Sequence, residues 1–217
     1  MTAVRAERLR AVFAAVVLRG RKTARRTAAR RLLVAAAASL CFPAALIAVS
    51  DAAVSRPADF RWFAAAPAPA SWSHHALPPR DGTLSYPVNF VVGNDKDGVA
   101  RERLDRHGSV LVYLDLSHKE GRERVSTWPS YRLGLVRGES DDVHDDGHAI
   151  GLRFRGGRGS CVLDDYRTRV ENHHYREIAC FVKGRRHASV LIAAALESAW
   201  THAVKTLERA VDAYRAT

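Results

Sequence analysis

Two of the three cysteines, Cys161 and Cys180, lie in the segment "GSCVLDDYRTRVENHHYREIACFVKG", residues 159–184. Thiols at this spacing could bind a metal, attack a substrate or pair as a disulfide. Zinc sites usually take thiolates from closely spaced pairs such as CxxC, which this chain lacks. A hairpin turning near residues 171–174 would bring the two cysteines roughly opposite each other on neighbouring strands. We therefore predict a structural disulfide, which an oxidising compartment permits and which would stabilise the domain by about 3 kcal/mol.

The segment "DDVHDDGH", residues 141–148, is the strongest metal candidate, because it holds four carboxylates and two imidazoles in eight positions. His144, His148 and Asp145 would be ligands of a divalent cation, and an exported metal-dependent hydrolase would follow from such a site. The Asp-Gly step and the density of charge are also typical of a solvated loop between two strands. We adopt the loop interpretation and predict neither a metal nor another cofactor.

Two further polar segments lie at expected turns. His173 and His174 are near Asp164 and Asp165 and could form an acid/base pair, although turn residues of this kind are usually solvated. The basic turn "KGRRH", residues 183–187, could contact anionic lipid headgroups or polymers, or simply be a solvated hairpin tip. Neither segment completes a catalytic motif, so no catalytic residue is predicted and we do not expect an enzyme.

Apolar patterning predicts the strands that would position these groups. Some segments alternate apolar and polar residues, as half-buried strands do, and others are apolar throughout, as central strands are. The cysteine segment is expected to form a hairpin of two strands. The predicted strands cover residues 109–116, 130–138, 149–157, 160–170, 175–182 and 188–196.

The C-terminal segment "ESAWTHAVKTLERAVDAYRA" has apolar residues in steps of four and three, which predicts an amphipathic helix. Its apolar face would consist of Trp200, Val204, Leu207, Val211 and Tyr214. The predicted fold class is therefore α+β: an antiparallel β-sheet with the C-terminal helix packed on one face, preceded by a single transmembrane helix.

The transmembrane prediction depends on the N-terminus, where most of the net charge of +11 is concentrated. Residues 1–31 hold ten Arg and Lys against one Glu, whereas the rest of the chain is nearly neutral. This leader precedes "LLVAAAASLCFPAALIAVS", residues 32–50, which has no charge. As a helix of about 28 Å it would match the hydrocarbon core of a bilayer. The charge asymmetry would place the leader in the cytoplasm and the remainder outside.

Three interpretations of the first fifty residues are open. Residues 32–50 could be a signal anchor that stays in the plasma membrane, which is the interpretation adopted. They could be a cleaved signal peptide, because Ala48-Val49-Ser50 offers small residues for processing. They could also be a buried helix behind a basic arm in a cytoplasmic nucleic-acid-binding protein. The nearly neutral body argues against this last alternative, so no nucleic acid partner is expected.

These boundaries divide the chain into four parts. The domain is long enough for one hydrophobic core. The parts are a basic cytoplasmic leader (1–31), a transmembrane signal anchor (32–50), an Ala/Pro-rich linker (51–80) and an extracytoplasmic α+β domain (81–217).

The order of elements over residues 109–217 resembles that of a known group. A curved antiparallel sheet, a glycine-marked hairpin, an apolar strand ending in "AAAL" and Trp200 opening a helix through "LERAVDAY" are similar to exported actinobacterial proteins with a PsbP-like or LpqN-like α+β domain. The resemblance implies a non-catalytic binding or accessory protein of the cell envelope, with no shared catalytic residues. We expect its partners to be the lipid bilayer, through residues 32–50, and an envelope protein.

Overall fold

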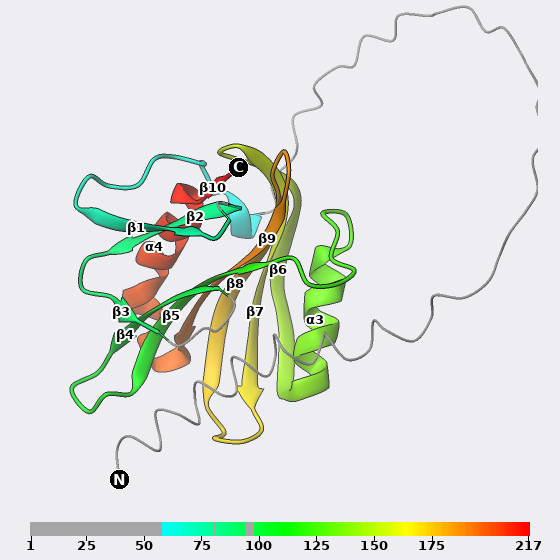
Figure 1. The fold of residues 1–217 in the computed structure, drawn as a ribbon. Coiled ribbons are helices and arrows are strands. Elements are labelled where there is room, and N and C mark those ends of the chain that lie inside the picture. The colour runs from blue at the N-terminus through cyan, green and yellow to red at the C-terminus, as the bar shows by residue number, and fades with distance from the viewer. Residues whose placement is uncertain (1–57, 80, 94–97) are drawn as a thin grey trace, which may run out of the picture.

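The structure is a computed structural model that describes residues 58–79, 81–93 and 98–217. These residues form two β-sheets, two α-helices and one short 3-10 helix (Figure 1). The predicted leader (1–31) and membrane segment (32–50) lie outside the described residues. Neither helix of the described part has both the length and the apolar content needed to cross a bilayer.

The larger sheet contains seven strands in the described residues, all antiparallel, in the order β3-β4-β5-β9-β8-β7-β6. The strands are β3 (Val91–Val92), β4 (Val99–Leu104), β5 (Val110–His118), β6 (Ser140–Phe154), β7 (Gly157–Thr168), β8 (His174–Lys183) and β9 (Ala188–Leu196). A smaller sheet has the order β1-β2-β10. Its strands are β1 (Trp72–Leu77), β2 (Gly82–Pro87) and β10 (Arg215–Ala216).

Helix α4 (Glu197–Ala213) covers one face of the large sheet, as its four-three spacing predicts. Leu207 and Val211 are fully buried, and they share one core cluster with residues of β7, β8 and β9. Tyr214, expected on the last turn, follows the helix end and is buried, with its hydroxyl 2.5 Å from that of Ser189. Burial raises the pKa of Tyr214 to about 12. The α+β class with a C-terminal helix on the sheet is therefore confirmed.

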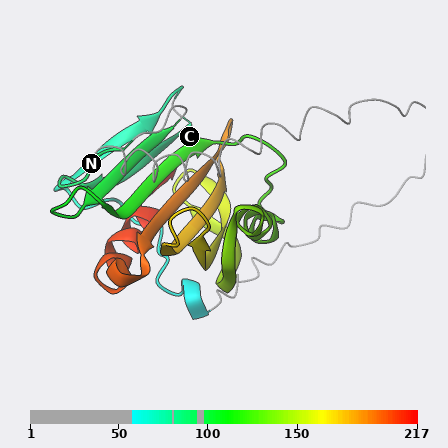
Figure 2. The same ribbon diagram turned by 90° about the horizontal axis from the view of Figure 1, so that it is seen from below.

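The prediction of a strand over residues 130–138 is wrong, because this segment forms helix α3 (Trp128–Glu139). Trp128, Arg132 and Val136 are spaced by four and lie buried on one side of the helix. Pro129 stands in the first turn, where its missing N–H costs nothing. Helix α3 packs on β6, β7 and β8, on the face opposite α4 (Figure 2).

Part of the predicted linker belongs to the fold. The 3-10 helix η1 (Ala58–Phe60) packs against β6, and both Phe60 and Phe63 are buried. The ring of Phe63 lies 4.7 Å from that of Phe154. The folded part of the chain therefore begins before residue 81, because Phe60 and Phe63 pack into the core and β1 pairs with β2.

The predicted loop at residues 141–148 is instead the first half of the long edge strand β6. The register shifts three times along the β6–β7 pairing, between Asp141 and His144, Asp145 and Gly147, and Ile150 and Leu152. An edge strand can carry many polar residues, because one side of it faces solvent, and bulges are common there. The charge of the segment is thus compatible with a strand.

Candidate functional site

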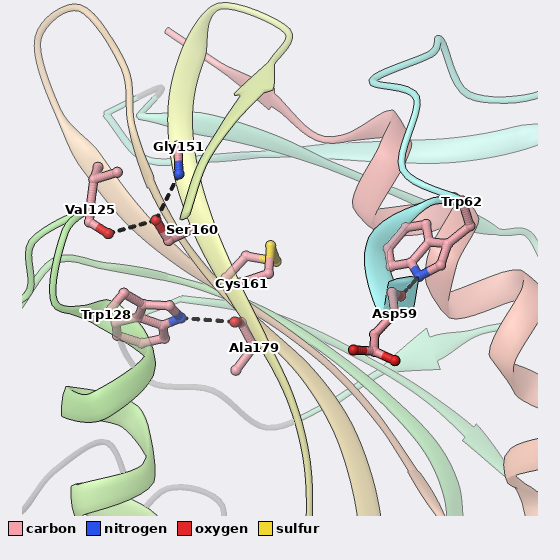
Figure 3. Close-up of a disulfide and its surroundings, with 9 residues drawn as sticks. Asp59, Trp62, Val125, Trp128, Gly151, Ser160, Cys161 and Ala179 are labelled. Carbon is pink, nitrogen blue, oxygen red and sulfur yellow. Dashed lines mark hydrogen bonds between the residues drawn. A yellow bond between two sulfur atoms is a disulfide. The ribbon is translucent and has the colours of Figure 1, made fainter. Parts of the chain in front are cut away.

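The structure confirms the predicted disulfide between Cys161 and Cys180. The two residues are direct partners in the β7–β8 register, and both are fully buried. Figure 3 shows the disulfide on the side of the sheet away from Trp128, where it belongs to the core cluster beneath α4. A bond buried in this way joins two central strands and is a structural feature.

The three metal candidates do not converge on one point. His144 Nδ1 lies 3.0 Å from Asp165 Oδ1, whereas His148 Nδ1 lies 3.1 Å from Asp145 Oδ2. Across residues 58–79, 81–93 and 98–217, no group of three or more His, Cys, Asp or Glu side chains is arranged to hold a metal ion. The long strand separates side chains that a compact loop would have brought together.

Asp165 instead forms the centre of a hydrogen-bonded group at this end of the molecule. Its Oδ1 atom lies 3.0 Å from His144 Nδ1 and 3.1 Å from His174 Nε2. Partial burial opposes ionisation, but the two imidazoles outweigh it and lower the pKa of Asp165. The hydrogen bond to Asp165 raises the pKa of His144. Of the two histidines expected in the turn, His174 contacts Asp165, whereas Asp164 is buried and forms no hydrogen bond with the described residues.

The remaining charges at this end also neutralise one another. Acidic residues of the first half of β6 face arginines of β7, the β7–β8 turn and β8. The ion pairs are Arg167–Asp142 at 3.0 Å, Arg169–Asp141 at 2.8 Å and Arg176–Asp146 at 2.6 Å. We call this the neutralised end of the domain.

A buried charged cluster attaches α3 to the sheet. Arg132 Nε donates to Glu177 Oε1 at 2.7 Å, and Tyr166 donates to Glu177 Oε2 at 3.2 Å. Asp164 is fully buried beside Glu177, and neither of its carboxylate oxygens has a hydrogen-bond partner among the described residues. Burial and then the charge of Glu177 raise the pKa of Asp164 well above its ordinary value. All four side chains of the cluster are more than nine-tenths buried.

The opposite end of the sheet carries an open cleft of about 870 Å³. Figure 1 shows the β6–β7 and β8–β9 turns at this end and the β7–β8 turn at the neutralised end. The volume is within the range of small-molecule sites. It is lined by Lys119, Glu123, Arg124, Val125, Ser126, Ile150, Gly151, Arg158, Phe181, Lys183, Gly184, Arg186, His187 and Ala188. We call it the basic cleft.

Most cations of the basic cleft lack an ion pair within the described part of the chain. Five exposed side chains, namely those of Lys119, Arg124, Arg158, Lys183 and Arg186, form no ion pair with any described residue.

The acidic groups near the cleft do not balance these charges. The carboxylate of Glu123 is buried and accepts hydrogen bonds from the backbone N–H of Gly121 at 2.7 Å and of Glu120 at 3.3 Å. Asp81 Oδ1 lies 3.6 Å from His187 Nδ1, so this carboxylate faces the imidazole of His187 and none of the five Lys and Arg side chains. The cleft is therefore strongly cationic.

Side-chain hydrogen bonds fix the walls of the basic cleft. Ser160 Oγ donates to the carbonyl of Val125 at 2.6 Å and accepts from the N–H of Gly151 at 3.2 Å (Figure 3). Trp128 Nε1 donates to the carbonyl of Ala179 at 2.8 Å. The loop before α3 and the bulge of β6 are thus held against the central strands, and the cleft is preformed.

Only the "KGRRH" part of this site, residues 183–187, is recognisable from the sequence. Lys119 and Arg124 follow β5, and Arg158 begins β7, so the cations come from segments far apart in the chain. Pairing of Arg158 with Lys183 across β7 and β8 and the hydrogen bond from Lys119 N to Ala188 O bring them together. The proximity of these cations therefore follows from the strand order and not from their positions in the sequence.

No protein-family model and no curated protein matches the chain. Among solved structures, the PsbP protein CyanoP of Synechocystis sp. PCC 6803 is similar over 69% of this chain and 94% of its own, with 10% identity and a TM-score of 0.48. The Ran-binding protein Mog1p of Saccharomyces cerevisiae is similar over 67% of this chain and 95% of its own, with 9% identity and a TM-score of 0.46. LpqN of Mycobacterium tuberculosis, which is involved in cell envelope biogenesis, is similar over 70% of this chain and 81% of its own, with 12% identity and a TM-score of 0.37.

These similarities are a weak resemblance of fold. They include the PsbP-like and LpqN-like groups that the order of elements suggests, and they assign no ligand, partner or bacterial group to this chain.

Proposed function

We propose that this chain is a non-catalytic binding or accessory protein of the cell envelope. In this proposal residues 32–50 anchor it in the membrane, the domain is extracytoplasmic, and the basic cleft binds an anionic ligand. The observation that carries the proposal is the set of five exposed Lys and Arg side chains around one preformed cleft, without ion pairs to the described residues.

Clustered like charges repel one another, so such a group is stabilised when an anion occupies the space between them. Three of the five are arginines, whose planar guanidinium groups match the oxygens of phosphate and carboxylate in pairs. The neutralised end is the internal comparison, because Arg167, Arg169 and Arg176 each have a carboxylate partner there. A solvated surface alone does not explain why one end is paired and the other is not.

Two further observations support the binding role and the compartment. The hydroxyl of Ser160 already donates to Val125, so it is not available as a nucleophile beside the cleft. The buried Cys161–Cys180 disulfide supports an oxidising environment, since such bonds are rare in the cytosol. His144 and His148 contact different carboxylates, so no observation favours the metal-dependent hydrolase.

Isothermal titration of the detergent-solubilised full chain with tripolyphosphate tests the proposal. The double variant Arg158→Gln/Lys183→Gln removes two neighbouring cations of the cleft. We expect it to bind about tenfold more weakly or worse, and we expect the affinity of the unaltered chain to fall with added salt.

The matched control is Arg106→Gln/Lys205→Gln, which removes one exposed Arg and one exposed Lys outside the cleft. It changes the net charge equally, so its affinity should stay near that of the unaltered chain. Equal losses in the two double variants would mean that tripolyphosphate responds to net charge and not to the cleft.

A further inference from the structure

We infer that the anion bound by the basic cleft is the phosphate headgroup of an anionic lipid, so that the cleft docks the domain on a bilayer surface. The inference rests on the proposed function and names the ligand class for the same site.

The first observation is an apolar side chain among the cations. Ile150 is 47% exposed, although it lies in the cleft between the loop before α3 and the β8–β9 turn. Val125, Phe181 and Ala188 also line this space. A soluble polyanion offers no apolar group to cover Ile150. A lipid headgroup carries its glycerol carbons and the first acyl carbons beside the phosphate, so it satisfies both the cations and the apolar side chain.

The second observation is the separation of charge along the sheet. Five cations without an ion pair among the described residues line the cleft at one end of the sheet, whereas the other end contains the acidic half of β6 with its paired arginines. Figure 1 shows the β6–β7 and β8–β9 turns at the first end and the β7–β8 turn at the second. A negatively charged bilayer attracts the first end and not the second. The domain therefore has one preferred orientation, with the basic cleft towards the headgroups.

The third observation is the distance available to the domain. Seven residues, 51–57, separate the predicted membrane segment (32–50) from η1. Even fully extended they span at most about 25 Å, whereas the fifteen residues of β6 extend over about 50 Å. A domain tethered so closely is held at the bilayer surface, where even weak headgroup contacts form at high effective concentration.

Hydrogen exchange measured by mass spectrometry tests this inference on the full chain reconstituted in nanodiscs. One set of discs contains phosphatidylcholine alone, and the other an equimolar mixture with phosphatidylglycerol. In the anionic discs we expect residues 119–126, 150–158 and 183–188 to exchange at least about threefold more slowly than in the neutral discs. Arg158→Gln/Lys183→Gln should abolish the difference, and Arg106→Gln/Lys205→Gln should preserve it.

Ile150→Ser separates a lipid from a soluble anion, because it removes the apolar contact and no charge. We expect it to reduce protection in the anionic discs by a clearly larger factor than it weakens tripolyphosphate binding. Equal exchange in both kinds of disc overturns the inference. If tripolyphosphate then still binds in the cleft, the proposed function stands and the ligand is a soluble anion or an anionic polymer. If tripolyphosphate does not bind either, the proposed function fails as well.

Discussion

Asp164 lies directly opposite Glu177 across β7 and β8, and both carboxylates are fully buried under α3. Arg132 and Tyr166 occupy the oxygens of Glu177, whereas those of Asp164 have no hydrogen-bond partner among the described residues. One guanidinium thus faces two acids. Burial and the neighbouring Glu177 raise the pKa of Asp164, so a proton on Asp164 restores the charge balance.

This arrangement predicts a pH dependence of stability. The folded-state pKa of Asp164 lies above the unfolded value, so its favourable contribution is present at acidic pH and is lost as the pH rises through the folded-state pKa. In Asp164→Asn this loss should disappear, and the variant should gain stability relative to the unaltered chain as the pH increases. Urea denaturation at a series of pH values measures the difference.

Asp165→Asn is the control of opposite sign. The pKa of Asp165 is lowered in the fold, so its contribution is present above the unfolded value and is lost as the pH falls through the folded-state pKa. The variant should therefore lose stability relative to the unaltered chain at neutral pH and approach it in acid. A stability difference for Asp164→Asn that does not change with pH would contradict the assignment of the buried proton.

Arg132 should be among the most sensitive positions for stability. Arg132→Leu leaves Glu177 buried without its cation, and we expect a loss of about 3–5 kcal/mol in the free energy of unfolding. Adding Glu177→Gln removes the orphaned charge, so Arg132→Leu/Glu177→Gln should recover part of the loss. Equal stability of the single and the double variant would show that the guanidinium acts by packing alone. Chemical denaturation provides both values.

The disulfide should contribute substantially to stability. Cys161 and Cys180 lie 19 positions apart in the chain, and replacing both by alanine removes the cross-link without leaving a free buried thiol. We expect the free energy of unfolding to fall by about 2–5 kcal/mol. Reduction of the unaltered chain should produce a comparable loss, and the double variant should not respond to reductant. A response of the variant to reductant would indicate another redox-sensitive group.

The contact between η1 and β6 depends on Gly147. Its φ of 154° disfavours other residues, and a Cβ atom there would collide with the carboxylate of Asp59. Gly147→Ala should therefore cost about 1–3 kcal/mol. Combining it with Asp59→Gly relieves the collision but not the backbone strain, so the double variant should regain only part of the stability. Thermal unfolding of the unaltered chain, the two single variants and the double variant separates the cost of the collision from the cost of the backbone strain.

The sequence predicts the elements whose pattern is local. The four-three spacing of Leu207 and Val211 identifies α4, and the apolar run ending in "AAAL" identifies β9. The hairpin of β7 and β8 follows from two apolar segments around a polar turn, and it carries the disulfide with it. These elements are predictable because the residues that determine them are neighbours in the chain.

Elements stabilised by distant contacts are not predictable in this way. In α3, Gly134 and Gly138 disfavour a helix, and the alternation of Tyr131, Leu133 and Leu135 imitates a strand. What stabilises the helix is the attachment of Trp128 to Ala179 and of Arg132 to Glu177, both more than 40 residues away. Tertiary contacts override the local pattern here.

The basic cleft is unpredictable for the same reason. Lys119, Arg158 and Lys183 become neighbours only through the strand order and register. The composition points elsewhere, since it concentrates the basic excess in residues 1–31 and leaves the body nearly neutral. The net charge of the body is nearly zero even though cations without ion pairs among the described residues gather at one end of the large sheet.

The rate of lysine acetylation with and without tripolyphosphate shows whether the anion binds in the basic cleft. Lys119 and Lys183 line the basic cleft, and the exposed Lys205 on α4 is an internal reference in the same molecule. We expect tripolyphosphate to slow acetylation of Lys119 and Lys183 and to leave the acetylation rate of Lys205 unchanged. If the acetylation rate of each of the three lysines is the same with and without tripolyphosphate, the anion does not bind in the basic cleft.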